Sequence, residues 1–286
     1  MDTLVVFGKL HKKRSGKKAI SPAISSVIMT GAMVALVSVT LVFANNFLWS
    51  SVAEADFNSS KQLMQTVGLQ IDDVAWTMGR TETTKYASQY GEVVFMPSAL
   101  TYTVTVNEEP KQYETGALMF NLPTSRYSIT NGYWENIFPH QNKSLTLKGT
   151  SAPVARVFAV EQLPMADGSY IRVVVAPAVR VLFSLINTSF SSTSYVKIYL
   201  PVLSPGESPR LSKSITLTGD SFTANTVDSV TAINVSVDFP REDSPENFDS
   251  IFFNFPFDSE DISVPSGDVV LELYLSEVSV GFGLNY

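Results

Sequence analysis

The sequence predicts an α+β fold in which one long N-terminal transmembrane and stem helix precedes a mainly antiparallel β-sandwich. No charged residue occurs from Ala19 to Ala53, and large apolar residues dominate the stretch Ile24–Trp49. Apolar residues then recur at helical spacing as far as Met78. After Arg80 the pattern changes to an alternation of polar and apolar residues, which is typical of strands with one buried face.

Residues 1–19 form a basic leader that we expect to lie in the cytoplasm. The first 18 residues hold six basic side chains and one acidic one, a net charge of +5, whereas the rest of the chain carries −12. A basic segment before an apolar one stays on the cytoplasmic side of a membrane, so the β-rich region is expected outside the cell. An acidic domain does not favour nucleic acid as a partner. The chain has no cysteine, which excludes disulfides and cysteine-based metal sites.

Residues 20–50 are predicted to cross the membrane as a helix, with lipid as the partner. At ~1.5 Å per residue, the stretch Ile24–Trp49 spans roughly 39 Å, which exceeds the roughly 30 Å of bilayer hydrocarbon and permits some tilt. Core helices of soluble proteins rarely run this long without a charge.

A secretory signal peptide is the competing interpretation of the same stretch. The sequence Ala53-Glu54-Ala55 offers an Ala-x-Ala cleavage site, and cleavage there would release a soluble domain that begins at Asp56. The apolar region of a signal peptide usually has ~7–15 residues, and this one is about twice as long. We therefore favour an anchor that stays in the mature protein.

The junction between leader and helix, KKAISPAI at residues 17–24, resembles that of archaeal type IV pilin-like proteins with class III signal peptides. In that family a membrane-embedded prepilin peptidase cuts after a basic and a small residue, directly before the apolar segment. The resemblance implies a processing site with Lys18 and Ala19 before the cleaved bond and Ile20 as the new N-terminus. The prepilin-type peptidase is then a partner, and the helix remains in the mature protein.

Ser21 and Pro22 match the Ser-Pro that often begins the helix in this family. Serine is a favoured N-cap residue, and proline suits the first helical turn because its missing N–H has no intrahelical partner there. The chain departs from many type IV pilins at the fifth mature position, where Ile24 replaces a glutamate thought to pair with a neighbouring subunit. This difference weakens the case for polymerisation more than the case for family membership.

Small residues within the predicted membrane helix mark an expected assembly face for self-association or for contact with other pilin-like subunits. Small side chains permit close approach of two membrane helices. The residues of this face are Gly31, Ala32, Ala35 and Ser38.

Residues 51–80 are predicted to form an amphipathic stem helix. It either continues the membrane helix without a break or follows it as a separate packing helix. Its apolar stripe consists of Phe57, Met64, Val67, Ile71, Val74 and Met78.

Residues 81–286 are predicted to form the β-rich extracellular domain. The stretch PVLSPGESP at 201–209 indicates either a boundary between two domains or, as we favour, a surface loop within one sandwich. The predicted strands are Gly91–Met96, Leu100–Val106, Ala117–Asn121, Ser144–Lys148, Ala155–Leu163, Tyr170–Val175, Ala178–Ile186, Tyr195–Val202, Ser214–Thr218, Ala232–Phe239, Ser250–Phe255 and Asp268–Phe282.

No catalytic motif, cofactor-binding motif or metal-binding motif stands out in this domain. His11 and His140 are the only histidines, and His11 lies in the leader, so a two-histidine zinc site is excluded. We interpret the acidic stretch Arg241–Asp261 as a solvated loop, and we expect the aromatic run Phe248–Phe257 to pack into the core. Candidate N-glycosylation sequons begin at Asn58, Asn142, Asn187 and Asn234.

These observations favour a pilin-like cell-surface protein, anchored or assembled through its apolar helix, with a role in a surface filament or in adhesion. The alternative is a binding or accessory module that is anchored by a single membrane pass and does not polymerise. An extracellular hydrolase is a third class, but no arrangement of residues supports it, and we expect no enzyme activity and no cofactor.

Overall fold

The computed structural model describes residues 22–140, 144–187, 192–207, 213–243 and 247–283. The chain divides into two units, one that ends at Leu48 and one that begins at Trp49. The 54-residue helix α1 (Pro22–Ala75) runs without a break through this division, so the predicted membrane and stem segments belong to one helix. The strand Ser192–Pro205 extends into the stretch 201–209, expected to be a loop, and it lies with the strands that follow in the second unit.

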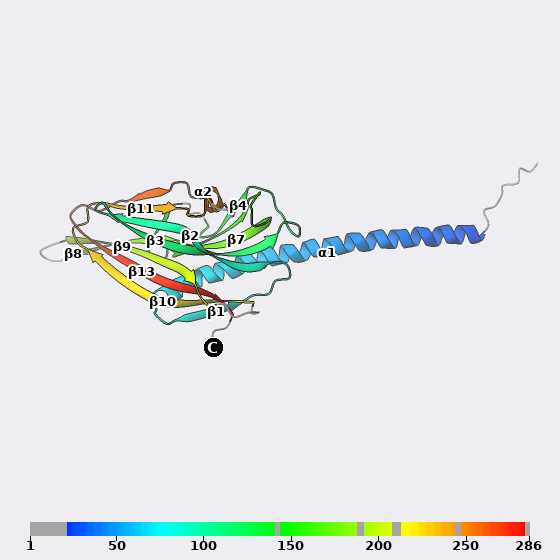
Figure 1. The fold of residues 1–286 in the computed structure, drawn as a ribbon, viewed down its shortest axis with the longest axis horizontal. Coiled ribbons are helices and arrows are strands. Elements are labelled where there is room, and N and C mark those ends of the chain that lie inside the picture. Colours follow the sequence, from blue (N-terminus) through cyan, green and yellow to red (C-terminus); the bar gives the residue numbers. More distant parts are fainter. Residues whose placement is uncertain (1–21, 141–143, 188–191, 208–212, 244–246, 284–286) are drawn as a thin grey trace, which may run out of the picture. The chain divides into compact units, whose positions relative to one another are not determined.

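A long N-terminal helix followed by two curled, mostly antiparallel sheets gives the α+β, sandwich-like fold that the sequence predicts (Figure 1). The strands are β1 (Thr81–Lys85), β2 (Glu92–Val106), β3 (Glu109–Pro123), β4 (Tyr133–Phe138), β5 (Thr146–Lys148), β6 (Ala155–Glu161), β7 (Tyr170–Pro177), β8 (Val179–Asn187), β9 (Ser192–Pro205), β10 (Ser214–Val227), β11 (Ile233–Asp238), β12 (Ser259–Ile262) and β13 (Asp268–Phe282). A short helix, α2 (Ser250–Phe253), lies between β11 and β12.

One sheet has the order β1-β10-β13-β9-β8-β5 and the other has the order β12-β11-β2-β3-β7-β6-β4. Strand β13 pairs in parallel with β9, and β5 pairs in parallel with β8, whereas the other pairs are antiparallel. Parallel partners need a long connection. Three strands, β10, β11 and β12, therefore lie in the sequence between β9 and β13, and β13 is placed between β10 and β9 in its sheet.

The central strands of the second sheet are buried on both faces. On β3, Leu118 and Phe120 point to a core that contains α1, and Met119 points to a core shared with the other sheet and α2. The same alternation holds in β6 and β7. All residues of β6 are buried, and so are all residues of β7 except Tyr170. Burial on both faces explains why the sequences of β6 and β7 are mostly apolar and do not alternate between polar and apolar residues.

The stem part of α1 buries the stripe that the sequence indicates. Phe57, Met64, Val67, Ile71 and Val74 have exposed fractions of 2% or less. Gly68 lets the helix approach β6, because a Cβ atom at this position would lie 2.9 Å from Val157 Cγ2.

The predicted end of the stem is wrong, since α1 stops at Ala75 and Met78 is 69% exposed in the turn that follows. The turn docks on β10 at Gly219, whose N–H donates to Arg80 O at 3.0 Å and whose carbonyl accepts from Gly79 N–H at 2.7 Å. A Cβ atom on Gly219 would lie 2.6 Å from Val74 O, so glycine is required there.

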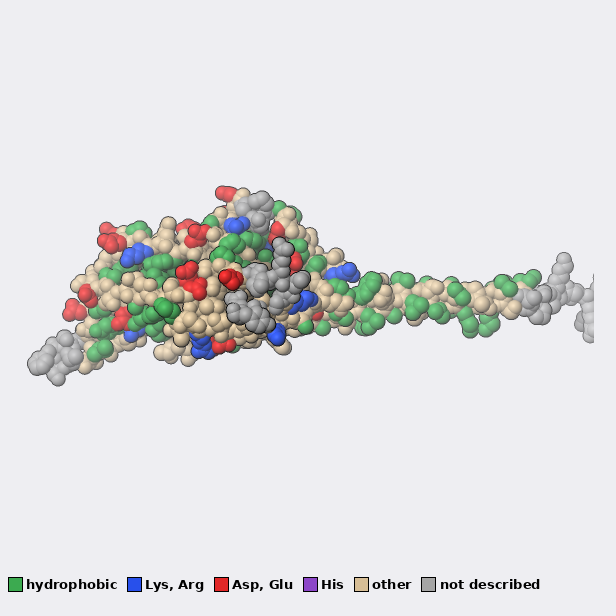
Figure 2. Space-filling view, turned by 60° about the horizontal axis from the view of Figure 1, so that its bottom comes forward, with side chains coloured by type: hydrophobic (Ala, Val, Ile, Leu, Met, Phe, Trp, Pro, Cys, Tyr) green, Lys and Arg blue, Asp and Glu red, His purple; other side chains and the backbone are tan. Residues whose placement is uncertain are grey.

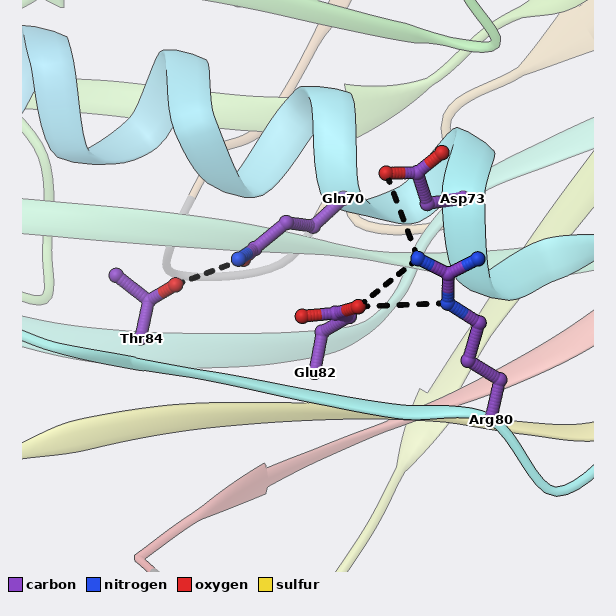
Figure 3. A network of polar contacts seen from close by, with 5 residues as sticks. All are labelled: Gln70, Asp73, Arg80, Glu82 and Thr84. Carbon is purple, nitrogen blue, oxygen red and sulfur yellow. Dashed lines mark hydrogen bonds and ion pairs between the residues drawn. The ribbon is translucent and has the colours of Figure 1, made fainter.

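Polar contacts between α1 and the following segment support this docking (Figure 3). Arg80 donates two hydrogen bonds to Glu82 and lies 3.8 Å from Asp73, and Thr84 donates to Gln70 at 2.8 Å. The chain therefore reverses from helix to strand β1 within a few residues and stays attached to the last turns of α1.

Three further segments differ from the predicted strands. The segments predicted at 91–96 and 100–106 form one strand, β2, with an irregularity between Met96 and Leu100. Strand β10 continues past the predicted end at Thr218 as far as Val227, with a bulge between Gly219 and Ser221. Ser250–Phe255, expected as a strand, contains α2, because Asp249 caps a helical turn by accepting from Phe252 N–H at 2.8 Å.

Candidate functional site: the apolar helix

Residues 24–48 of α1 are exposed throughout, and α1 is the one helix within the described residues that is long and apolar enough to cross a membrane. Val27, Phe43 and Phe47 have exposed fractions of 71–74%. Figure 2 shows this segment covered by hydrophobic side chains without acidic or basic ones. A bare apolar surface of this length needs an apolar environment to cover it.

Three hydroxyl groups in this segment donate hydrogen bonds to carbonyl groups of the same helix. Thr30 donates to Ser26 O at 2.9 Å, Ser38 to Val34 O at 2.8 Å and Thr40 to Leu36 O at 2.8 Å. In hydrocarbon an unsatisfied polar group costs several kcal/mol, and bonding to the carbonyl four residues earlier avoids this cost. The side chains of these three residues are therefore compatible with lipid.

The residues of the predicted processing site, Lys18, Ala19 and Ile20, lie outside the described residues, as does Ser21. Pro22 is the first residue of α1, the position expected for it at the start of the helix.

The four residues of the predicted assembly face, Gly31, Ala32, Ala35 and Ser38, are all exposed. Nothing lies within 4 Å of a Cβ atom built on Gly31, so packing within this chain does not require a glycine there. Glycine in a helix interior costs roughly 0.5–1 kcal/mol relative to alanine. Close approach of a second helix would account for it.

The Ala-x-Ala motif of the competing signal-peptide interpretation lies inside α1. Ala53 is fully buried, and the helix passes through Glu54 and Ala55 without a break. Just beyond, Asp56 accepts hydrogen bonds from Ser88 Oγ and from the N–H groups of Gln89 and Tyr90 at 2.8–3.0 Å. The region around the motif is thus part of the packed β unit.

An aromatic and basic cluster surrounds the first residue of this unit. The Arg126 guanidinium lies 5.6 Å from the ring centre of Trp49 and 5.0 Å from that of Tyr90. Trp49 itself is 44% exposed. Only the fold brings Arg126 and Tyr90 to Trp49, and no pattern in the sequence indicates this cluster.

The candidate glycosylation sites differ in exposure. Asn58 on α1 and Asn187 at the end of β8 are exposed, whereas Asn142 lies outside the described residues. Asn234 is half-buried, and its amide nitrogen donates to Ser259 and Asp261 at 2.8 Å.

The remaining candidates for chemistry have structural roles. His140 is exposed, and in the described ranges no group of three or more His, Asp or Glu side chains is placed to hold a metal ion. Within the acidic stretch, Asp249 caps α2 and Glu260 pairs with Lys148 at 2.9 Å. The aromatic run packs into the core as expected, with Phe248, Phe252, Phe253 and Phe255 buried and Phe257 exposed.

Comparison of the chain with protein-family models, with curated proteins and with solved structures found no match.

Proposed function

We propose that this protein is a pilin-like structural protein of the cell surface, held in the membrane or in a filament by residues 22–48 of α1, with a role in adhesion. The observation that carries the proposal is the exposed, uncharged first half of α1, which is continuous with a stem buried in a β domain. A helix of this kind serves as anchor or assembly core, and the β domain is the part presented outside.

Two features support an anchor in preference to a removable signal sequence. The helix runs through the Ala-x-Ala motif, and Ala53 is buried in the β unit. Removal of residues up to Ala55 would strip Ala53 from that core, whereas cleavage between Ala19 and Ile20 leaves all of the described fold intact.

The resemblance of residues 17–24 to class III signal peptides assigns the prepilin-type peptidase as the processing enzyme. A structural role in preference to a catalytic one agrees with the structural use of Glu161, the one buried carboxylate among the described residues. Its side chain is 1% exposed and accepts hydrogen bonds from Ser128 Oγ and Ile129 N–H.

A non-polymerising anchored module is the second candidate. Ile24 stands where many type IV pilins carry the glutamate that pairs with a neighbouring subunit. Without this pair, the small-residue face around Gly31 is the remaining basis for subunit contact through the helix.

N-terminal sequencing of the mature protein, combined with membrane fractionation, tests the proposal. An N-terminus at Ile20 in a product that resists carbonate extraction is expected. An N-terminus at Asp56 in the culture medium would contradict it. Electron microscopy of sheared surface material then separates a filament subunit from an accessory module.

A further inference from the structure

We propose that residues 182–186 of β8 form a self-association site, at which the free edge of this strand pairs with the same segment of a second copy. The pairing is antiparallel and has its two-fold axis at Ser184. The site lies in the β unit, and it does not depend on the small-residue face of α1.

The first observation is an open strand edge. Strand β8 pairs with β9 over residues 180–187, but on its other side β5 covers only residues 179–181. Within the described part of the chain, Leu182 to Ile186 thus have one neighbouring strand. Backbone N–H and C=O groups on such an edge are a template for a further strand.

The second observation is the apolar character of this edge. Phe183, Leu185 and Ile186 are 47%, 59% and 52% exposed. These are among the few large apolar side chains of the β unit that remain outside its two cores.

The segment Leu-Phe-Ser-Leu-Ile is complementary to itself. In an antiparallel pair centred on Ser184, Phe183 of each copy lies opposite Leu185 of the other, on one face of the joined sheet. Leu182 lies opposite Ile186 on the other face, because side chains alternate between faces along a strand. The small Ser184 meets its own copy at the axis. Every apolar side chain of the segment therefore gains an apolar partner.

Charge favours this edge for contact between copies. The β-rich region carries most of the chain's negative charge, so two copies repel each other over most of their surface. The other edge strands carry charges that oppose pairing, namely Glu82 and Lys85 on β1, Glu135 on β4, Lys148 on β5, and Glu260 and Asp261 on β12. Residues 182–186 carry none. Charged side chains are a common protection against edge pairing, and β8 lacks it.

The strength of this contact depends on the proposed function. Stable interfaces use about 20–30 residues from each side, so one short strand pair is weak between free molecules. Anchoring of many copies on two facing surfaces brings many such contacts together and raises their effective concentration. The self-association is therefore expected on the surface and not in dilute solution.

Single cysteines test the pairing, since the chain has none of its own. In the full-length protein in liposomes, Ser184→Cys should form a disulfide-linked dimer under mild oxidation, because directly opposed Cβ atoms lie about 4.5–5.5 Å apart. A mixture of Phe183→Cys and Leu185→Cys should link at least about fivefold more than either variant alone, because residues two places out of register are about 7–8 Å apart. Thr81→Cys, exposed on the opposite edge strand, is the control.

Equal linking of Ser184→Cys and Thr81→Cys would overturn the inference, as would a mixture that links no better than its components. Adding Leu185→Lys to Ser184→Cys should lower the dimer yield at least about fivefold without a change in the near-ultraviolet circular dichroism. Flotation of the same liposomes reports the anchor separately. Protein that floats but shows no excess of linking at Ser184 overturns the inference alone. Protein that does not float overturns the proposed function and, because the contact depends on anchoring, the inference with it.

Discussion

Asp72 of α1 binds Arg180 of β8, with 3.0 Å between Asp72 Oδ2 and Arg180 Nη1. The other carboxylate oxygen of Asp72 accepts from Trp76 Nε1 at 2.7 Å. The Arg180 guanidinium also lies 4.5 Å from the ring centre of Tyr199 and 5.8 Å from that of Trp76. One carboxylate thus joins the last turns of the helix to the sheet that contains β8 and β9.

Asp72→Ala should lower the free energy of unfolding by about 1–3 kcal/mol, because it leaves Arg180, which is 12% exposed, without its carboxylate. Thermal unfolding of the full chain in detergent, followed by near-ultraviolet circular dichroism, measures the change. The neighbouring Asp73→Ala is the matched control. Asp73 is 66% exposed and lies 3.8 Å from Arg80, so its loss should change stability by less than about 0.5 kcal/mol. Equal effects of the two variants would show that the Arg180 contact does not stabilise the fold.

Gly219→Ala should destabilise the β unit by roughly 1–3 kcal/mol, because the added methyl group would lie 2.6 Å from Val74 O and 2.8 Å from Thr77 O. Both of these atoms belong to the backbone, which cannot move aside as a flexible side chain can. Urea unfolding monitored by tryptophan fluorescence tests this. Asp220→Ala, which alters the exposed neighbour in the same bulge, should have little effect, and a larger loss there than at Gly219 would contradict the docking role of the glycine.

Acid should weaken the contact between the stem and β4. Burial raises the pKa of Glu135, but hydrogen bonds from Lys61 and Tyr133 outweigh this and hold the pKa below its ordinary value of 4.5. A carboxyl with a lowered pKa in the folded state stabilises the fold above its ordinary pKa, and this contribution is lost as the pH falls through the folded value. The stability difference between the wild type and Glu135→Gln should therefore shrink between pH 7 and pH 3.

Unfolding measured at several pH values checks this expectation. The exposed Glu114→Gln serves as a control for the loss of one negative charge. A constant gap between the wild type and Glu135→Gln down to pH 3 would contradict the role of the Lys61 pair.

Large side chains on the small-residue face should weaken helix association in the membrane. Gly31→Leu with Ala35→Leu prevents the close approach of two helices that small side chains permit. Energy transfer between labelled copies in liposomes should fall several-fold, with membrane retention unchanged. Val37→Leu changes another face of α1, and an equal loss of transfer in that variant would argue against a specific assembly face.

Features that depend on local periodicity could be predicted from the sequence. The uncharged stretch to Trp49 and the stripe from Phe57 to Val74 belong to one helix, and strand β13 has its predicted bounds, Asp268–Phe282. Prediction failed at the end of the stem, where a residue distant in the chain decides the outcome, and at Ser250–Phe253, where the adjacent Asp249 does. Gly219 sets the place where the turn after α1 docks, and the cap by Asp249 outweighs the strand-like aromatic pattern of the segment that follows.

The sequence by itself determined the apolar helix, the β-rich nature of the rest and the absence of disulfides, because each follows from residue type and from spacing along the chain. Only the tertiary structure decided the parallel pairing of β9 with β13, the burial of β6 and β7 on both faces, and the open edge at Ser184. These features arise from contacts between residues far apart in the chain. Such contacts depend on which strands become neighbours, and no local pattern records that choice.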